Sequence, residues 1–129
     1  MELEGEVTEG IGEGADYIGK EVYQDRFEEV LGFRPFPGTL NLEVDSEERE
    51  VFEKETESRS IEDVYEGDDR LSDVEVTPVE VRGIRAGLLR LEKTDHPLSI
   101  AEIVAPVKLR DELGLEDGDS LILSPVRHT

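Results

Sequence analysis

Thr39 and Asn41 are the residues whose types and spacing point most directly to chemistry. They follow a Pro37-Gly38 turn and stand two positions apart in a short alternating run, so on a strand both side chains point to one face. A hydroxyl and a carboxamide supply neutral oxygen ligands, which suit a hard cation that is already neutralised by phosphates. The alternative is an ordinary solvated face, opposite an apolar one.

A glycine-rich segment, residues 10–15, is a second candidate site. Glycine at every second position disfavours strand and helix, but it lets a backbone approach a ligand and present N–H groups to an anion. A flexible hairpin loop is the alternative. Residues 14–21 have the spacing of a P-loop, but Glu21 replaces the hydroxyl residue that Mg²⁺ requires, and no strand–helix repeat surrounds them. A P-loop fold is therefore not expected.

Two cations and one carboxylate near the end of the chain are further candidates. Lys108 and Arg110 fall in the first turns of a short helix predicted over 106–114, where the helix dipole adds to their charge. Glu102 is the only charge in an apolar strand predicted over 99–105, and the commoner position for such a residue is the exposed face.

The composition limits the classes of function. The 129 residues favour one domain, 1–129, and the net charge of −20 repels nucleic acids and anionic lipids. There is no cysteine, no long apolar run and no signal-like start, which predicts a cytoplasmic protein without membrane or nucleic-acid partners. The acidic excess, with arginine outnumbering lysine, suggests a halophilic cytoplasm in which salt screens the charge.

The elements that must position these residues are mostly strands. Alternation predicts strands over 2–9, 40–44, 74–81, 84–91, 99–105 and 120–126, and an amphipathic helix over 20–31 that ends at Gly32. Residues 45–73 are acidic with few apolar anchors, so we expect a variable insert or loop, with one or two short strands near 49–56. Six strands without a βαβ repeat favour a small β-barrel.

Several of these segments together, in register and in order, resemble archaeal CTP-dependent riboflavin kinases. The matching stretches are 10–14, 31–33, 38–42, Lys93-Thr94 with His96, 102–106 and 108–110. The resemblance covers nearly the whole chain, except 45–73. It implies a six-stranded cradle-loop barrel, related to riboflavin kinases, with two or three short helices. It also implies transfer of the γ-phosphoryl group of CTP to the 5′-hydroxyl of riboflavin, giving FMN and CDP.

The resemblance also implies roles for individual residues. Mg²⁺ would be held by Thr39 and Asn41, and the flavin would contact Thr94 and Glu102. The nucleotide would be bound by two segments: Gly10, Ile11, Gly12, Glu13, Gly14 and Ala15, and Val107, Lys108, Leu109 and Arg110. Ala15 stands where family members have a basic residue, which puts one phosphate contact in doubt. Glu102 is the candidate general base, although it can instead orient the flavin by a hydrogen bond.

Two other hypotheses remain open at the level of sequence. One is a flavin- or nucleotide-binding barrel without turnover. The other is a swapped-hairpin barrel of the transcription-regulator kind, which the closing segment 108–121 resembles but which the charge of −20 opposes. For the kinase we expect a monomer that acts on small molecules.

Overall fold

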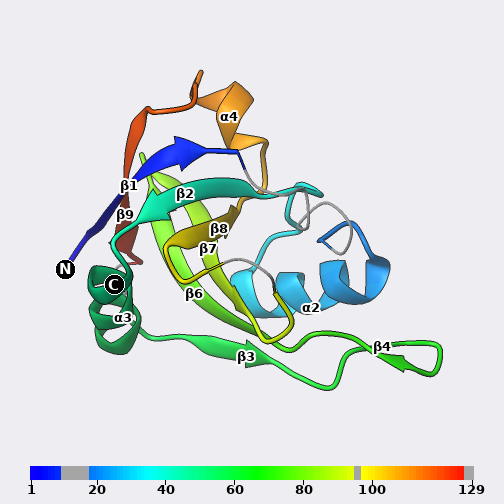
Figure 1. The fold of residues 1–129 in the computed structure, drawn as a ribbon. Coiled ribbons are helices and arrows are strands. Elements are labelled where there is room, and N and C mark those ends of the chain that lie inside the picture. Colours follow the sequence, from blue (N-terminus) through cyan, green and yellow to red (C-terminus); the bar gives the residue numbers. More distant parts are fainter. Residues whose placement is uncertain (10–17, 95–96, 127–129) are drawn as a thin grey trace.

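Six antiparallel strands close a barrel in the computed structural model, which describes residues 1–9, 18–94 and 97–126. The barrel strands are β1 (Leu3–Thr8), β2 (Leu40–Val44), β6 (Val74–Val81), β7 (Ile84–Leu91), β8 (Ile100–Val104) and β9 (Ser120–Pro125). Their order is β6-β7-β8-β2-β1-β9, and β9 pairs with β6 again to close the ring (Figure 1). The predicted six-stranded barrel is confirmed, with three helices in the described ranges.

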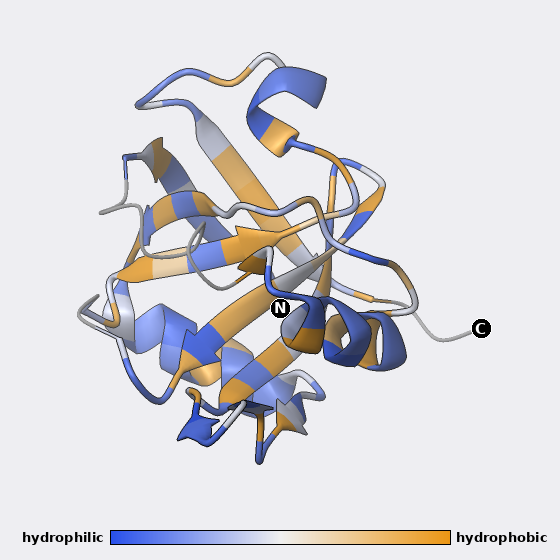
Figure 2. Ribbon diagram, turned by 90° about the vertical axis from the view of Figure 1, so that its right-hand side faces the viewer, coloured by the Kyte–Doolittle hydropathy of each residue, from blue (hydrophilic) through white to orange (hydrophobic). Residues whose placement is uncertain are grey.

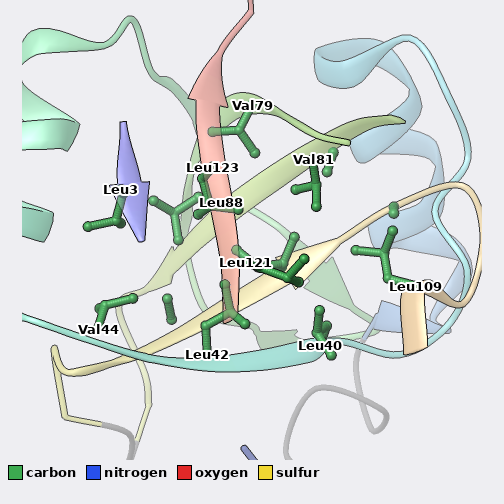
Figure 3. Close-up of a cluster of buried hydrophobic side chains, with 14 of the residues drawn as sticks. Leu3, Leu40, Leu42, Val44, Val79, Val81, Leu88, Leu109, Leu121 and Leu123 are labelled. Atoms are coloured by element: carbon green, nitrogen blue, oxygen red, sulfur yellow. The ribbon is translucent and has the colours of Figure 1, made fainter. Parts of the chain in front are cut away.

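Alternating apolar residues of these strands fill the barrel. On β2, Leu40, Leu42 and Val44 are buried in its interior, as the alternation predicts. Figure 3 shows them directed into the same space as side chains from β1, β6, β7 and β9. Because successive side chains on a strand alternate, Asn41 must lie on the outer face of the barrel wall.

The β6–β7 hairpin forms as predicted. Arg82 and Gly83 both have positive φ angles, 48° and 81°, which matches the twist of a two-residue hairpin. Pro78 lies in the middle of β6 at a break in pairing, because one edge of β6 pairs with β3 (Arg59–Ile61) up to Val76 and with β9 only from Val79. A residue without an N–H donor is tolerated at such a break.

Helix α2 (Glu21–Leu31) covers the outer face of β6 and β7. Its Tyr23, Phe27 and Leu31 form a second apolar cluster with residues of these strands, while its outward face is hydrophilic (Figure 2). The predicted stop at Gly32 is confirmed. Gly32 has φ 82° and donates its N–H to the Glu28 carbonyl, a left-handed cap that glycine adopts readily.

Tyr23 should make stability depend on alkaline pH. Its side chain is 1% exposed and donates to the Ser72 carbonyl at 2.6 Å. Burial, with the charge of Asp73 adding to it, raises the pKa of Tyr23 from 10.0 to about 12. The unfolded chain therefore releases this proton at lower pH than the folded protein, so the stability present at neutral pH is lost as the pH rises from about 10 to about 12.

We expect this loss to be about 1 kcal/mol between about pH 9 and about pH 11. Urea unfolding of the wild type and of Tyr23→Phe at both pH values measures it, and the variant should lack that part of the decline. Equal declines in both proteins would show that Tyr23 ionises normally.

The expectation for residues 45–73 is wrong in part, because residues 46–55 form helix α3 (Ser46–Glu55) instead of short strands near 49–56. The Asp45 carboxylate caps the helix by accepting from the Glu48 N–H at 3.0 Å. Arg49 and Phe52, three residues apart, form its buried face. The remainder holds β3 and a small hairpin, β4 (Tyr65–Glu66) and β5 (Asp69–Arg70), which turns at Gly67, where φ is 64°.

Helix α4 (Leu109–Glu112) is shorter than the predicted 106–114. Lys108 stands at its N-cap position and Pro106 precedes it. In Figure 1 it lies near one end of the barrel, beyond β2 and β8. None of the helices in the ranges described has the length and apolar character that crossing a bilayer requires.

Candidate active site

A cavity of about 590 Å³ opens beside the end of β2 that leads from the Pro37-Gly38 turn. It combines the predicted metal pair, Thr39 and Asn41, with the predicted nucleotide segment 107–110. These residues are distant in sequence but meet at one end of the barrel. The lining residues are Thr8, Glu9, Phe36, Pro37, Gly38, Thr39, Leu40, Asn41, Ile103, Ala105, Val107, Lys108, Leu109 and Arg110.

Two backbone hydrogen bonds fix the turn that leads into the metal pair. The Phe36 N–H donates to the Ala105 carbonyl at 2.8 Å, and the Gly38 N–H donates to the Phe36 carbonyl at 2.8 Å. The first bond ties the turn to the chain just after β8, and the second closes the turn itself. The backbone that leads into Thr39 and then into β2 is therefore fixed by these two bonds.

The side-chain oxygen of Asn41 is suited to a cation. Asn41 Oδ1 is buried and has no hydrogen-bond partner within the described part of the chain. A buried polar atom without a partner costs about 1–3 kcal/mol, so such an atom commonly marks a ligand position. Carboxamide and hydroxyl oxygens are ligands that Mg²⁺ accepts, and the residues present therefore fit this ion.

A row of paired residues crosses the barrel wall at this point. Thr8 of β1 pairs with Asn41 of β2, Asn41 pairs with Glu102 of β8, and Glu102 pairs with Leu89 of β7. Directly opposite residues on neighbouring strands share one face, with Cβ atoms about 5 Å apart. The carboxylate of Glu102 thus lies next to the predicted metal pair, on the outer face.

The expected exposure of Glu102 is wrong. Alternation correctly puts it opposite Ile103, but the residue is 2% exposed. The outer face of β8 is covered here, since residues from α3 and the segment after Pro97 surround Glu102. A buried carboxylate in the wall of a cavity is a better candidate for proton transfer than an exposed one.

A second cavity, of about 260 Å³, contains both residues predicted to contact the flavin, Thr94 and Glu102. It is lined by Arg49, Glu50, Leu89, Arg90, Leu91, Thr94, Pro97, Leu98, Ile100 and Glu102. Asn41 lines the first cavity, and its paired neighbour Glu102 lines the second. One residue of this pair thus lines the predicted metal and nucleotide cavity, and the other lines the predicted flavin cavity.

The two cations of the predicted nucleotide segment form ion pairs only near the surface. Lys108 Nζ lies 3.8 Å from Asp111, and Arg110 Nη2 lies 2.8 Å from Asp117, both at partly exposed positions. Exposed ion pairs of this kind contribute little, so the two cations can exchange these carboxylates for phosphate oxygens. The predicted contribution of a helix dipole is reduced, because α4 has only four residues.

Part of the predicted nucleotide site cannot be compared with the structure. Gly10, Ile11, Gly12, Glu13, Gly14 and Ala15 fall outside the described residues, so their predicted role stays a prediction. A further cavity of about 260 Å³ lies beside the end of α2 and the end of β9, and none of the predicted site residues lines it.

Several residues of these cavities were missed by the sequence analysis, among them Thr8, Phe36 and Arg49. Thr8 and Phe36 line the first cavity, and Arg49 lines the second. For Thr8 and Phe36 no local signal exists, because only strand pairing and the turn bring them there. For Arg49 a signal was present: a capping Asp45 three residues before Glu48 predicts a helix that carries it.

The barrel and its cavities define a small closed antiparallel β-barrel protein with a cleft of mixed polar and apolar lining at one end. The family model described as "CTP-dep_RFKase: Domain of unknown function DUF120" matches residues 7–124, and the chain belongs to this family. This confirms the resemblance found in the sequence.

Curated relatives agree with the family. The riboflavin kinase of Archaeoglobus fulgidus is 40% identical over 123 residues, which cover 92% of this chain and 52% of that protein. That of Methanosarcina acetivorans is 40% identical over 124 residues (95% and 52%), and that of Pyrobaculum arsenaticum is 40% identical over 121 residues (92% and 58%). The chain spans about half the length of the curated relatives it matches.

Proposed function

We propose that this chain is a riboflavin kinase that transfers the γ-phosphoryl group of CTP to the 5′-hydroxyl of riboflavin, giving FMN and CDP, with Mg²⁺ bound by Thr39 and Asn41. The observation that carries the proposal is the Asn41–Glu102 pair, which adjoins two cavities. One cavity holds the segment assigned to the nucleotide and the other holds the residues assigned to the flavin. Both substrates can therefore meet at this pair.

At phosphorus, the proposed reaction forms one bond and breaks one. The 5′-oxygen of riboflavin bonds to the γ-phosphorus, the bond from that phosphorus to the β,γ-bridging oxygen breaks, and CDP leaves. The Glu102 carboxylate accepts the hydroxyl proton as this happens. In support of this role, Glu102 lines the second cavity and is paired with Asn41, which lines the first.

Positioning of the substrates and neutralisation of phosphate charge account for the remaining rate enhancement, as is usual for phosphoryl transfer. Lys108 and Arg110 line the nucleotide cavity and supply positive charge for the phosphates. Neutral Thr39 and Asn41 leave the charge of a bound cation undiminished. The chemistry that Mg²⁺ supplies in such a site is neutralisation of the charge on the transferring phosphate.

The nucleotide preference tests this function. Purified protein is incubated with riboflavin, Mg²⁺ and one of CTP, UTP, ATP or GTP, in molar potassium chloride and in low salt, and FMN is quantified. We expect FMN with CTP at a rate at least about tenfold above that with ATP, a discrimination that one lost pocket hydrogen bond can give. The high-salt reaction should be the faster one, because salt screens the charge of −20.

The outcomes separate the possible functions. Absence of FMN with all four nucleotides in both salts would overturn the kinase. Riboflavin binding without turnover would favour the non-catalytic binding barrel, and equal rates with CTP and ATP would leave a kinase without the proposed donor preference.

A further inference from the structure

Arg49 of α3 is a buried cation outside the residues assigned to substrates. Its side chain is 3% exposed and lines the cavity that contains Thr94 and Glu102. It belongs to the acidic stretch 45–73, to which the resemblance assigns no role. A charge this deeply buried is costly unless it is paired and hydrogen-bonded, so its position requires a reason.

All three nitrogens of the Arg49 guanidinium donate hydrogen bonds. Nε donates to Glu53 Oε1 at 3.2 Å, and Nη2 donates to the Leu89 carbonyl at 2.9 Å. Nη1 donates to the carbonyls of Leu98 at 2.9 Å and Ile100 at 3.0 Å. One side chain thus connects α3 with β7 and with the start of β8.

These carbonyls lie where two barrel strands separate. The β7–β8 pairing ends at the Leu89–Glu102 pair, although β7 continues to Leu91 in its pairing with β6. Beyond this point the facing backbone groups of β7 and β8 cannot satisfy one another. Arg49 lies at this fork and donates hydrogen bonds to the carbonyls of Leu89 and Ile100. These carbonyls would be costly to bury without a donor.

The fork is also the wall of the second cavity. Leu89, Leu98 and Ile100, whose carbonyls receive the Arg49 bonds, all line it. Glu102 is paired with Leu89 and stands two residues after Ile100. Any movement of the fork therefore moves Glu102 relative to the cavity.

Arg49 also contributes charge to the cavity. Burial lowers the pKa of Arg49, while the charges of Glu53 and Glu102 act to raise it. An arginine stays protonated under such influences, so it places a positive charge in the wall of the cavity that Glu102 also lines. Glu53 is also bound to Arg90 at 2.9 Å, so the partner that holds Arg49 is itself fixed.

We propose that Arg49 is a positioning residue for the flavin side of the reaction, which holds the fork between β7 and β8 open and sets Glu102 against riboflavin. This role rests on the proposed riboflavin kinase function. The role requires a planar guanidinium, whose donors are spread over three nitrogens. The ammonium of a lysine has its three donors on one nitrogen and cannot reach Glu53, β7 and β8 together.

Arg49→Lys and Arg49→Gln test the role. We expect Arg49→Lys to raise the KM for riboflavin by about tenfold or more, since small displacements of positioning groups have large kinetic effects, with the KM for CTP within about twofold of wild type. Arg49→Gln, which also removes the charge beside Glu102, should lower kcat further. Riboflavin binding, followed by quenching of flavin fluorescence, should weaken in parallel with KM.

Val79→Ala is the matched control for a merely structural effect. Val79 is fully buried in the barrel interior on β6 and lines neither site cavity, so its truncation lowers stability without touching the fork. It should leave the ratio of the two KM values unchanged. If Arg49→Gln does not fold, Arg49→Lys, which keeps the charge, decides the question.

Each outcome is decisive. Two outcomes in Arg49→Lys would overturn the positioning role and leave the kinase intact. One is an unchanged KM for riboflavin. The other is a parallel rise of both KM values, as in a control of equal thermal stability. If the wild type neither binds riboflavin nor forms FMN, the proposed function fails and the role of Arg49 falls with it.

Discussion

Asn41→Ala should lower kcat for FMN formation by at least about 100-fold, while riboflavin binding stays within about twofold of wild type. Asn41 Oδ1 is a buried oxygen with no partner in the part of the chain that the structure describes, beside Thr39 in the nucleotide cavity. Its removal takes away a proposed cation ligand but no wall of the second cavity. Steady-state kinetics at saturating CTP and riboflavin measure the loss.

The same variant has a readout that does not depend on activity. Binding of Mn²⁺ in the presence of CDP, followed by electron paramagnetic resonance, should weaken by about tenfold or more in Asn41→Ala. The stability of the metal-free protein should hardly fall, because the deleted oxygen makes no hydrogen bond with the described residues.

Glu43→Gln is the control for Asn41→Ala. Glu43 lies on the same face of β2, two residues further along, but is exposed and lines neither site cavity. Its variant should keep wild-type kinetics and Mn²⁺ binding. Wild-type kcat and Mn²⁺ affinity in Asn41→Ala would refute the metal assignment.

Glu102→Gln is the second prediction with a large effect, a fall in kcat of about 100-fold at neutral pH. The amide keeps the shape of the carboxylate, which is 2% exposed, but it cannot accept a proton. The KM for riboflavin should change by no more than about threefold, since a hydrogen bond from the substrate hydroxyl can persist.

The opposite pattern would assign Glu102 a different role. A raised KM for riboflavin with kcat intact would mean that the carboxylate only orients the flavin and that the proton goes elsewhere. Glu43→Gln again serves as the control, because it removes one carboxylate from the neighbouring strand without entering the cavity.

Much of the framework could be predicted because the signals are local. The alternation of Leu40, Leu42 and Val44 defines both faces of β2, and Gly32 ends α2, since each depends only on neighbouring residues. The order of the segments also led to the family, which the match over residues 7–124 confirms.

Other features were missed because their local signals are weak or absent. Helix α3 was missed because its buried face has only Arg49 and Phe52 among many acidic residues, so no apolar stripe revealed it. The buried Arg49 is held by three carbonyls, those of Leu89 in β7, Leu98 just before β8 and Ile100 in β8. That convergence depends on contacts between residues about 40 to 50 positions apart.

By itself, the sequence determined that Thr39 and Asn41 share one face of a strand and that Glu102 lies opposite Ile103 on another. Only the tertiary structure decided that Asn41 and Glu102 are paired neighbours between two cavities and that Glu102 is buried. The reason is physical: alternation is a property of one strand, whereas register and burial depend on which distant segments pack against it.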